Sequence, residues 1–111
     1  MRRAVERFNS SEERRKVAGL IRSLGEPQAG VRPDPRRQLA LVTVAWELSW
    51  YQWEVSADGD GADELVREVA KGAEISELAK EVRAWNATVE EDGTLRLRSA
   101  AERSRQAAQE A

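Results

Sequence analysis

The chain has 111 residues, with 18 lysine and arginine residues, 20 aspartate and glutamate residues, and neither histidine nor cysteine. This length is typical of one domain. The missing residue types exclude disulfides, thiol nucleophiles, a Ser-His-Asp triad and zinc sites with histidine or cysteine ligands. The sequence therefore favours a protein that is not an enzyme, and it predicts no catalytic residue, no cofactor and no metal ligand.

The acidic and basic residues are unevenly distributed along the chain, although the net charge is only −2. Residues 1–37 hold ten basic and five acidic residues, whereas residues 38–111 hold eight and fifteen. A chain with a net negative charge is a poor candidate for general nucleic-acid binding. No apolar run is long enough to span a membrane, and no apolar segment typical of a signal peptide follows the basic start. We therefore expect a cytoplasmic protein without a membrane partner.

The predicted organisation is a single domain over residues 10–98 with a shorter segment on each side. Residues 1–9 are expected to form a flexible, basic lead-in, in which Val5 and Phe8 can pack against the domain. Residues 99–111 are rich in alanine and charged residues and contain no large aliphatic or aromatic side chain. This last segment is expected to be either an Ala-rich C-terminal helix or a frayed tail.

A helix is predicted over residues 11–24. Its apolar positions follow the spacing of a single helical stripe, and they are Val17, Leu20, Ile21 and Leu24. Ser10 and Glu13 have the spacing of a capping box at the start of this helix. Gly25 can adopt the left-handed conformation that ends a helix, and Pro27 prevents its continuation.

Residues 39–56 hold three of the four tryptophans and the only tyrosine, and two interpretations of this segment are open. A helix would form one stripe from Leu39, Val42, Trp46, Trp50 and Trp53. The many β-branched and aromatic residues favour strands instead. We therefore predict strands at about 39–47 and 50–56, with a further edge strand at 28–32.

The apolar positions of this segment change parity after Trp50. Even-numbered positions are apolar up to Trp50, and odd-numbered positions are apolar from Tyr51 onward. Strand side chains alternate with period two, so the shift predicts a bulge or a wide turn near residues 47–50. No Gly, Asn or Asp there supports a tight primed turn. Trp46 and Trp50 would then share one face of the sheet, and Tyr51 and Trp53 the other.

Two short helices are expected in the next part of the chain. One covers residues 62–71, with a strand through 65–69 as the alternative. The other covers residues 76–85, and its apolar positions at helical spacing are Leu78, Val82 and Trp85. The acidic stretch at 58–64 resembles the start of a calcium loop but lacks ligands at the fifth and twelfth positions of that motif. We interpret it as a solvated turn.

Residues 86–98 are predicted to form a hairpin whose register follows from the side-chain pattern. A three-residue loop at Glu91–Gly93 gathers the apolar side chains on one face. The opposed pairs are then Val89 with Leu95 and Ala87 with Leu97, whereas Thr88 and Arg96 point outward. Gly93 takes the left-handed position that such a loop requires.

Together these elements predict an α+β fold. A small antiparallel sheet has strands at about 39–47, 50–56, 86–90 and 94–98, and helices at about 11–24 and 76–85 cover one of its faces. A domain this small buries limited apolar surface, so oligomerisation is one way to complete its core.

The aromatic segment is the feature that suggests a function. The predicted interaction surface consists of Trp46, Trp50, Tyr51, Trp53 and Glu54. Contiguous exposed aromatic residues mark contacts, so we predict a small non-enzymatic interaction or assembly module that binds itself, as a homodimer or higher oligomer, or another protein. The alternative interpretation is that the rings supply the core, since each one buries a large area.

Two other functions stay open. The first is a nucleic-acid-associated protein whose phosphate contacts are Arg14, Arg15, Lys16 and Arg22. The second is a small-ligand binding protein or enzyme in which Glu47, Tyr51 and Glu54 line an aromatic pocket. Apolar surroundings of that kind raise the pKa of a carboxyl group, which is a requirement for acid–base chemistry near neutral pH.

Overall fold

One antiparallel sheet, two helices and a crossing segment make up the structure. The computed structural model describes residues 2–56 and 66–98 and has an α+β fold, as predicted. The elements are α1 (Arg2–Asn9), α2 (Glu12–Leu24), β1 (Gln28–Asp34), β2 (Leu39–Trp46), β3 (Ser49–Ser56), β4 (Val66–Gly72), the 3-10 turns η2 (Ile75–Glu77) and η3 (Lys80–Arg83), β5 (Ala87–Val89) and β6 (Leu95–Leu97). Among the described residues, no helix is both long and apolar enough to cross a membrane.

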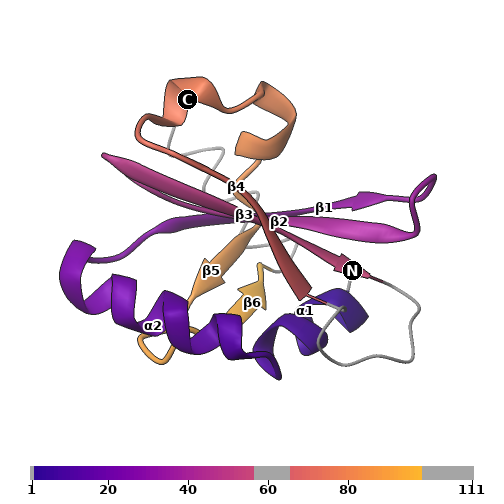
Figure 1. Cartoon of the computed structure of the whole chain (residues 1–111), viewed down its shortest axis with the longest axis horizontal. Coiled ribbons are helices and arrows are strands. Elements are labelled where there is room, and N and C mark those ends of the chain that lie inside the picture. Colours follow the sequence, from indigo (N-terminus) through magenta and orange to yellow (C-terminus); the bar gives the residue numbers. More distant parts are fainter. Residues whose placement is uncertain (1, 57–65, 99–111) are drawn as a thin grey trace.

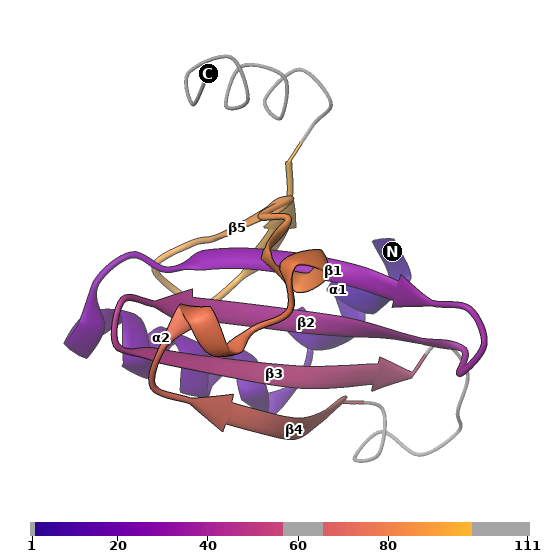
Figure 2. The same ribbon diagram turned by 90° about the horizontal axis from the view of Figure 1, so that it is seen from above.

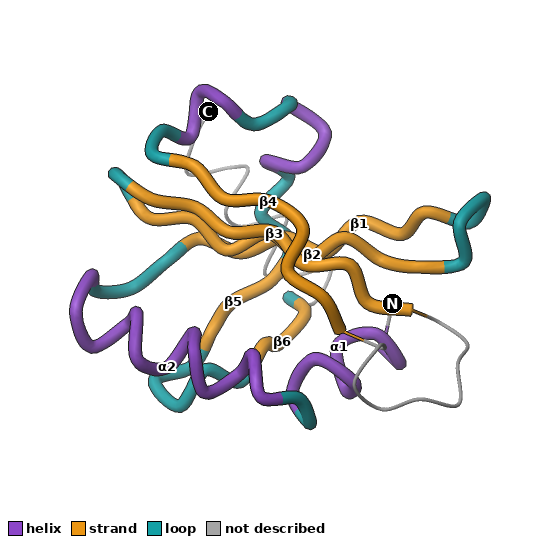
Figure 3. The backbone as a smooth tube through the Cα atoms, viewed as in Figure 1, coloured by secondary structure: helices purple, strands orange, loops and turns teal. Residues whose placement is uncertain are grey.

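The strands pair in the order β4-β3-β2-β1-β5-β6, and each of these pairs is antiparallel. Helices α1 and α2 lie along one face of the sheet, and residues 73–85 cross the opposite face (Figures 1 and 3). We call the face toward the helices the inner face, the opposite one the outer face, and residues 73–85 the strap. Figure 2 shows the strap lying across the central strands when the sheet is viewed from above.

The inner face carries the main core, and Trp53 is one of its largest fully buried side chains. Phe8 of α1 packs edge-on against Trp53, with 5.3 Å between ring centroids, and Tyr51 stacks on it at 6.0 Å. The other buried members of this core are Ala4, Val5, Val17, Ala29, Val31, Ala40, Val42, Val44, Trp46, Val55, Ala87, Val89 and Leu95. Both helices and strands β1, β2, β3, β5 and β6 therefore contribute to one continuous core.

Residues 2–9 form helix α1 and not the flexible lead-in that the sequence predicted. Val5 and Phe8 are buried against the sheet, as their apolar character suggested. The segment has only eight residues, half of them charged, so its helical conformation depends on this packing. The Arg7 guanidinium also donates a hydrogen bond to the carbonyl of Ser56, which connects α1 to the end of β3.

Helix α2 confirms the helix predicted over residues 11–24. Its inward stripe is Val17, Leu20 and Ile21, with Leu24 exposed at the end. Ser11 and not Ser10 occupies the N-cap position, and its hydroxyl donates to the carbonyl of Phe8 at 2.6 Å. The predicted capping box is therefore wrong. Gly25 has a φ of 90° and ends the helix as expected.

Strands β2 and β3 form a hairpin with a tight two-residue turn at Glu47–Leu48. The helical interpretation of residues 39–56 is therefore wrong, and so is the predicted bulge or wide turn near residues 47–50. Neither turn residue has a positive φ, so the turn does not require the residues typical of a primed turn. Opposed residues of the hairpin share a face, which puts Trp46, Tyr51 and Trp53 on the inner face and Trp50 on the outer face. The predicted grouping of Trp46 with Trp50 was wrong.

Strand β1 lies inside the sheet, between β2 and β5, and not at the edge expected for residues 28–32. It pairs with β5 only at Ala29. The Asn86 side chain then takes the place of a strand, because it accepts a hydrogen bond from the Val31 N–H at 2.8 Å and donates one to the Val31 carbonyl at 2.9 Å. Pro33 has no N–H, so the second half of β1 tolerates an open edge.

Strand β4 occupies part of the segment where a helix over residues 62–71 was predicted. Its described residues pair with β3, which agrees more closely with the alternative strand through 65–69. The register shifts between Gln52 and Trp53, and Val69 is the extra residue on β4. The acidic stretch at 58–64 lies outside the described residues.

The strap contains two short 3-10 turns where a helix over residues 76–85 was predicted, and it covers the outer face instead of joining α2. Leu78 is buried against Trp50. The Glu77 carboxylate accepts two backbone N–H groups at the start of the strap, at 2.9 and 2.7 Å, and the Trp50 indole N–H at 3.3 Å. A Cβ on Gly72 would lie 2.5 Å from the Trp50 ring. The indole therefore fills the space over this glycine, and the strap closes over it.

The predicted hairpin at residues 86–98 is confirmed in its register. The opposed pairs are Ala87 with Leu97, Thr88 with Arg96 and Val89 with Leu95. Gly93 has a φ of 86°, and a Cβ at this position would lie 2.1 Å from the carbonyl oxygen of Arg14. The turn therefore needs glycine both for its backbone conformation and for its close approach to α2. The Ala-rich segment at 99–111 lies outside the described residues.

Candidate functional site

The aromatic side chains predicted as an interaction surface are mostly core residues. Trp46, Trp50 and Trp53 are 5%, 8% and 0% exposed, and Tyr51 is half-buried. The Trp46 indole N–H also donates a hydrogen bond to the carbonyl of Gly25 at 2.7 Å. These rings therefore supply the core, as in the alternative interpretation, and the candidate site lies elsewhere on the molecule.

Glu54, the remaining residue of that predicted surface, lies on the outer face and holds two arginines. Its carboxylate accepts hydrogen bonds from Arg37 at 2.6 Å and from Arg67 at 3.0 Å. The Glu54 side chain is only 13% exposed. Desolvation is the largest single influence and acts to raise its pKa, but the hydrogen bonds and charges of the two arginines together outweigh it and lower the pKa of Glu54. Glu54 therefore stays ionised and orients two guanidinium groups.

Glu54 lies at one end of a groove on the outer surface of β1 and β2. The groove consists of two depressions of about 360 and 490 Å³, which share Arg32, Pro33 and Leu41. Leu39 and Leu41 are half-buried and form an aliphatic floor, because the odd-numbered positions of β2 point away from the core. The strap contributes a wall at one end, and the loop after β1 bounds the other. We call this feature the outer groove.

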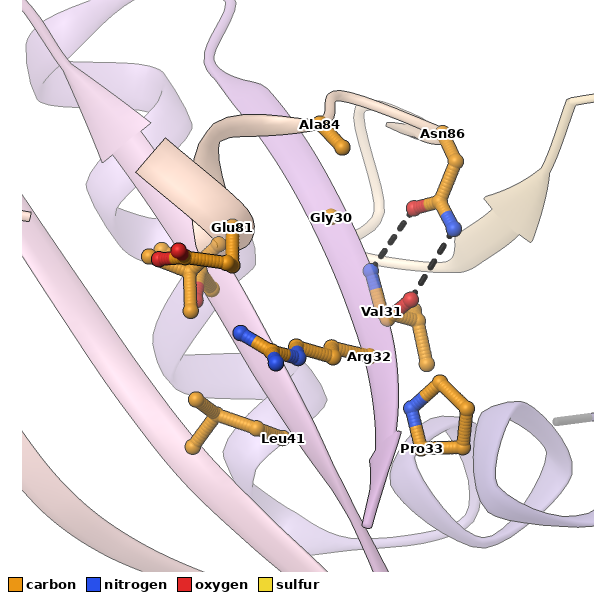
Figure 4. Close-up of a pocket in the computed structure, with 10 residues that line it drawn as sticks. Gly30, Val31, Arg32, Pro33, Leu41, Glu81, Ala84 and Asn86 are labelled. Carbon is orange, nitrogen blue, oxygen red and sulfur yellow. Dashed lines mark hydrogen bonds between the residues drawn. The ribbon is translucent and has the colours of Figure 1, made fainter. Parts of the chain in front are cut away.

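The strap end of the outer groove places one cation and one anion opposite each other. In Figure 4, the Arg32 guanidinium extends past Leu41 toward Glu81 on the strap. No ion pair joins Arg32 to Glu81. The Asn86 amide lies on the far side of β1 with its two hydrogen bonds to Val31. Arg32 therefore follows a residue of β1 that is paired with β2 on one side and hydrogen-bonded to Asn86 on the other.

Arginines outnumber acids at the loop end of the outer groove. The charged side chains there are Arg32, Arg36, Arg37, Asp34 and Glu54, with Arg67 beside them through Glu54. Asp34 accepts a hydrogen bond from the backbone N–H of Arg37 at 3.3 Å. Within residues 2–56 and 66–98, neither Arg32 nor Arg36 forms an ion pair. This end is therefore cationic although the whole chain carries a net charge of −2.

The basic residues predicted as nucleic-acid contacts are Arg14, Arg15, Lys16 and Arg22, all on α2. Arg14 donates a hydrogen bond to a carbonyl in the β5–β6 turn at 2.7 Å. Lys16 pairs with Glu68 of β4, and its ammonium lies 5.2 Å from the centre of the Tyr51 ring. The other two are exposed. Two of the four therefore contact this chain itself, and they do not gather into one free basic surface.

The residues expected to line an aromatic pocket do not come together. Glu47 lies in the β2–β3 turn, Tyr51 on the inner face and Glu54 on the outer face. The described parts of the chain also contain no cluster of three acidic, histidine or cysteine side chains placed to hold a metal ion. The structure thus offers no shared site for these three residues.

Comparison with known protein families, curated proteins and solved structures found no match for this chain. The candidate site therefore rests on its own geometry and charge. Sequence analysis named Glu54 but missed Arg32, Leu39 and Leu41. The sequence does contain a signal for this site. The odd-numbered positions of β2 include the aliphatic residues Leu39 and Leu41, although the valines and Trp46 already supply the core from the even-numbered positions.

Proposed function

We propose that this protein is a cytoplasmic, non-enzymatic protein-interaction module that binds its partner through the outer groove. The observation that supports the proposal is the incomplete cover of the sheet, because the strap crosses only part of the outer face. The rest presents Leu39 and Leu41 beside several arginines. Sheet faces are normally buried against another layer, and an aliphatic centre with a polar rim is the usual composition of a protein interface.

The sequence also suggested an interaction module, but it placed the interaction surface on the aromatic segment and not on the outer groove. The aromatic segment cannot provide a broad exposed face, since Trp46, Trp50 and Trp53 are buried within one chain. A partner, whether a second copy or another protein, would therefore contact β1, β2 and the arginines beside them.

Site-specific photocrosslinking in the native host tests this assignment. A benzophenone side chain placed at Leu41 should give one discrete crosslinked product, whose mass shows whether the partner is a second copy or another protein. The same group placed at Arg15, which is exposed on α2, serves as the matched control and should give none. If Leu41 gives no product, or if both positions give the same set of products, the outer groove is not the interaction surface.

A further inference from the structure

We infer that the outer groove takes an extended, acidic and aliphatic segment of another protein. This inference rests on the function proposed above and adds the chemistry of the partner. It follows from three features of the groove: the positions of its charges, the composition of its floor and the state of the neighbouring strand edge.

The charges favour carboxylates at the loop end of the groove. Arg32 and Arg36 line this end and have no ion-pair partner among the described residues. Glu54 is shared between Arg37 and Arg67, so that group of three side chains keeps one positive charge. The planar guanidinium group of arginine matches the geometry of a carboxylate. Acidic side chains of a partner therefore fit at this end.

The floor of the groove favours a peptide over a nucleic acid. Leu39 and Leu41 offer an aliphatic surface, and none of the residues that line the groove is aromatic. Proteins that bind single-stranded nucleic acids without sequence preference combine a basic groove with aromatic rings on which the bases stack. This groove has the basic side chains without the rings, so aliphatic side chains next to carboxylates match it better.

The open edge of β1 limits how the segment can bind. Strand addition needs a row of free backbone N–H and carbonyl groups. Here the Asn86 amide occupies both groups of Val31, and Pro33 has no N–H. The segment is therefore recognised through its side chains. Glu81 at the strap end repels acids, which places the acidic part of the segment toward Arg36.

Among residues 2–56 and 66–98, a second copy of this chain offers no acidic segment that is free to bind in an extended form. Within the described residues, the acidic stretches are the strap and the β5–β6 turn at 90–92. The strap is packed on Trp50. The turn is held by hydrogen bonds from Arg14 and Thr94 to Asp92. Neither stretch is available as an extended segment without local unfolding.

Fluorescence anisotropy with a short labelled peptide of alternating glutamate and leucine tests the inference. The peptide should bind the full chain, and the double variant Arg32→Glu/Arg36→Glu should weaken binding on the order of tenfold or more. The double variant Arg15→Glu/Arg22→Glu makes the same change in net charge on exposed positions of α2 and should bind normally. A lysine–leucine peptide and an oligothymidine strand should bind far more weakly than the acidic peptide.

Several outcomes would overturn the inference. These are no binding of the acidic peptide, equal weakening by both double variants, and tighter binding of the lysine–leucine peptide or of oligothymidine. A failure here is distinguishable from a failure of the proposed function. If the peptide does not bind but Leu41 still gives a discrete crosslinked product, the groove is an interaction surface for a partner of different chemistry. If neither result is obtained, the proposed function fails as well.

Discussion

Two asparagine side chains complete the backbone hydrogen bonding of this sheet at positions where a neighbouring strand is missing. Asn86 pairs with both backbone groups of Val31. Asn9 does the same on β6, where it donates to the Leu95 carbonyl at 2.9 Å and accepts from the Leu95 N–H at 2.7 Å. A carboxamide carries one acceptor and a donor group in a geometry close to that of a peptide unit. Each asparagine side chain therefore forms the two hydrogen bonds that a residue of a neighbouring strand would form, and it prevents further pairing at that point of the edge.

Replacing Asn86 with alanine tests this role at the residue scale. The Asn86→Ala change leaves the N–H and the carbonyl of Val31 without their partner, next to the outer groove. We expect the free energy of unfolding to fall by about 1–3 kcal/mol, which is the usual cost of leaving such groups unpaired. Urea unfolding measures it. The change Gln28→Ala, at an exposed position of the same strand, is the control, and an equal loss in both variants would contradict the role of the amide.

At the scale of the elements, the parts that could be predicted are those whose chemistry is local. The hairpin at 86–98 was predictable in its register because alternating side chains and Gly93 both select the same loop. The β2–β3 turn was not, because Glu47–Leu48 turns without a positive φ and so contains no residue typical of a tight turn. Because the turn has two residues, Trp46 is paired with Ser49. The next residue, Trp50, therefore lies on the face opposite Trp46 and not on the same face as predicted.

The strap and the groove were beyond prediction because they depend on contacts between distant segments. Leu78, Val82 and Trp85 have helical spacing, yet the strap forms two 3-10 turns and packs on Ala45 and Trp50. The outer groove forms where β1, β2 and the strap meet. Its arginines come from loop and strand positions that carry no motif, so sequence analysis found only Glu54.

The strap also contains a carboxylate whose titration should control how tightly it is held. Hydrogen bonds from the backbone N–H of Glu74 and then of Ala73 keep the pKa of Glu77 below the ordinary value of a glutamate. A lowered folded-state pKa stabilises the strap at pH values above the unfolded value of about 4.3. This stabilisation is lost as the pH falls through the folded value.

Hydrogen exchange at the Leu78 amide and at the Trp50 indole N–H measures this effect. Protection, corrected for intrinsic exchange, should be constant near neutral pH and fall below about pH 4. The Glu77→Gln variant keeps an acceptor oxygen but cannot titrate, so its protection should not change with pH in this range. Glu81→Gln, on the exposed carboxylate of the same segment, should keep the acid-dependent loss. A loss of protection that persists in Glu77→Gln would show that another group holds the strap.

At the scale of the whole molecule, one chain covers the aromatic residues on both faces of the β2–β3 hairpin. The helices bury Trp46 and Trp53 on the inner face, and the strap buries Trp50 on the outer face. The sequence alone, with rings on two sides of a strand, suggests that a partner is needed to cover them. The strap removes that need, because it forms a second small core without a second chain. The surface available to a partner is therefore the uncovered part of the outer face.

This arrangement predicts how the four indoles respond to a neutral quencher such as acrylamide. Trp85 is half-buried at the end of the strap, whereas the other three are at most 8% exposed. Most of the quenchable fluorescence should therefore come from Trp85, and Trp85→Phe should remove it at any protein concentration. Trp46→Phe, which changes a buried indole, should leave the quenchable part in place. If dilution instead makes further indoles accessible, a second chain and not the strap shelters them, and the single-chain core described here would be wrong.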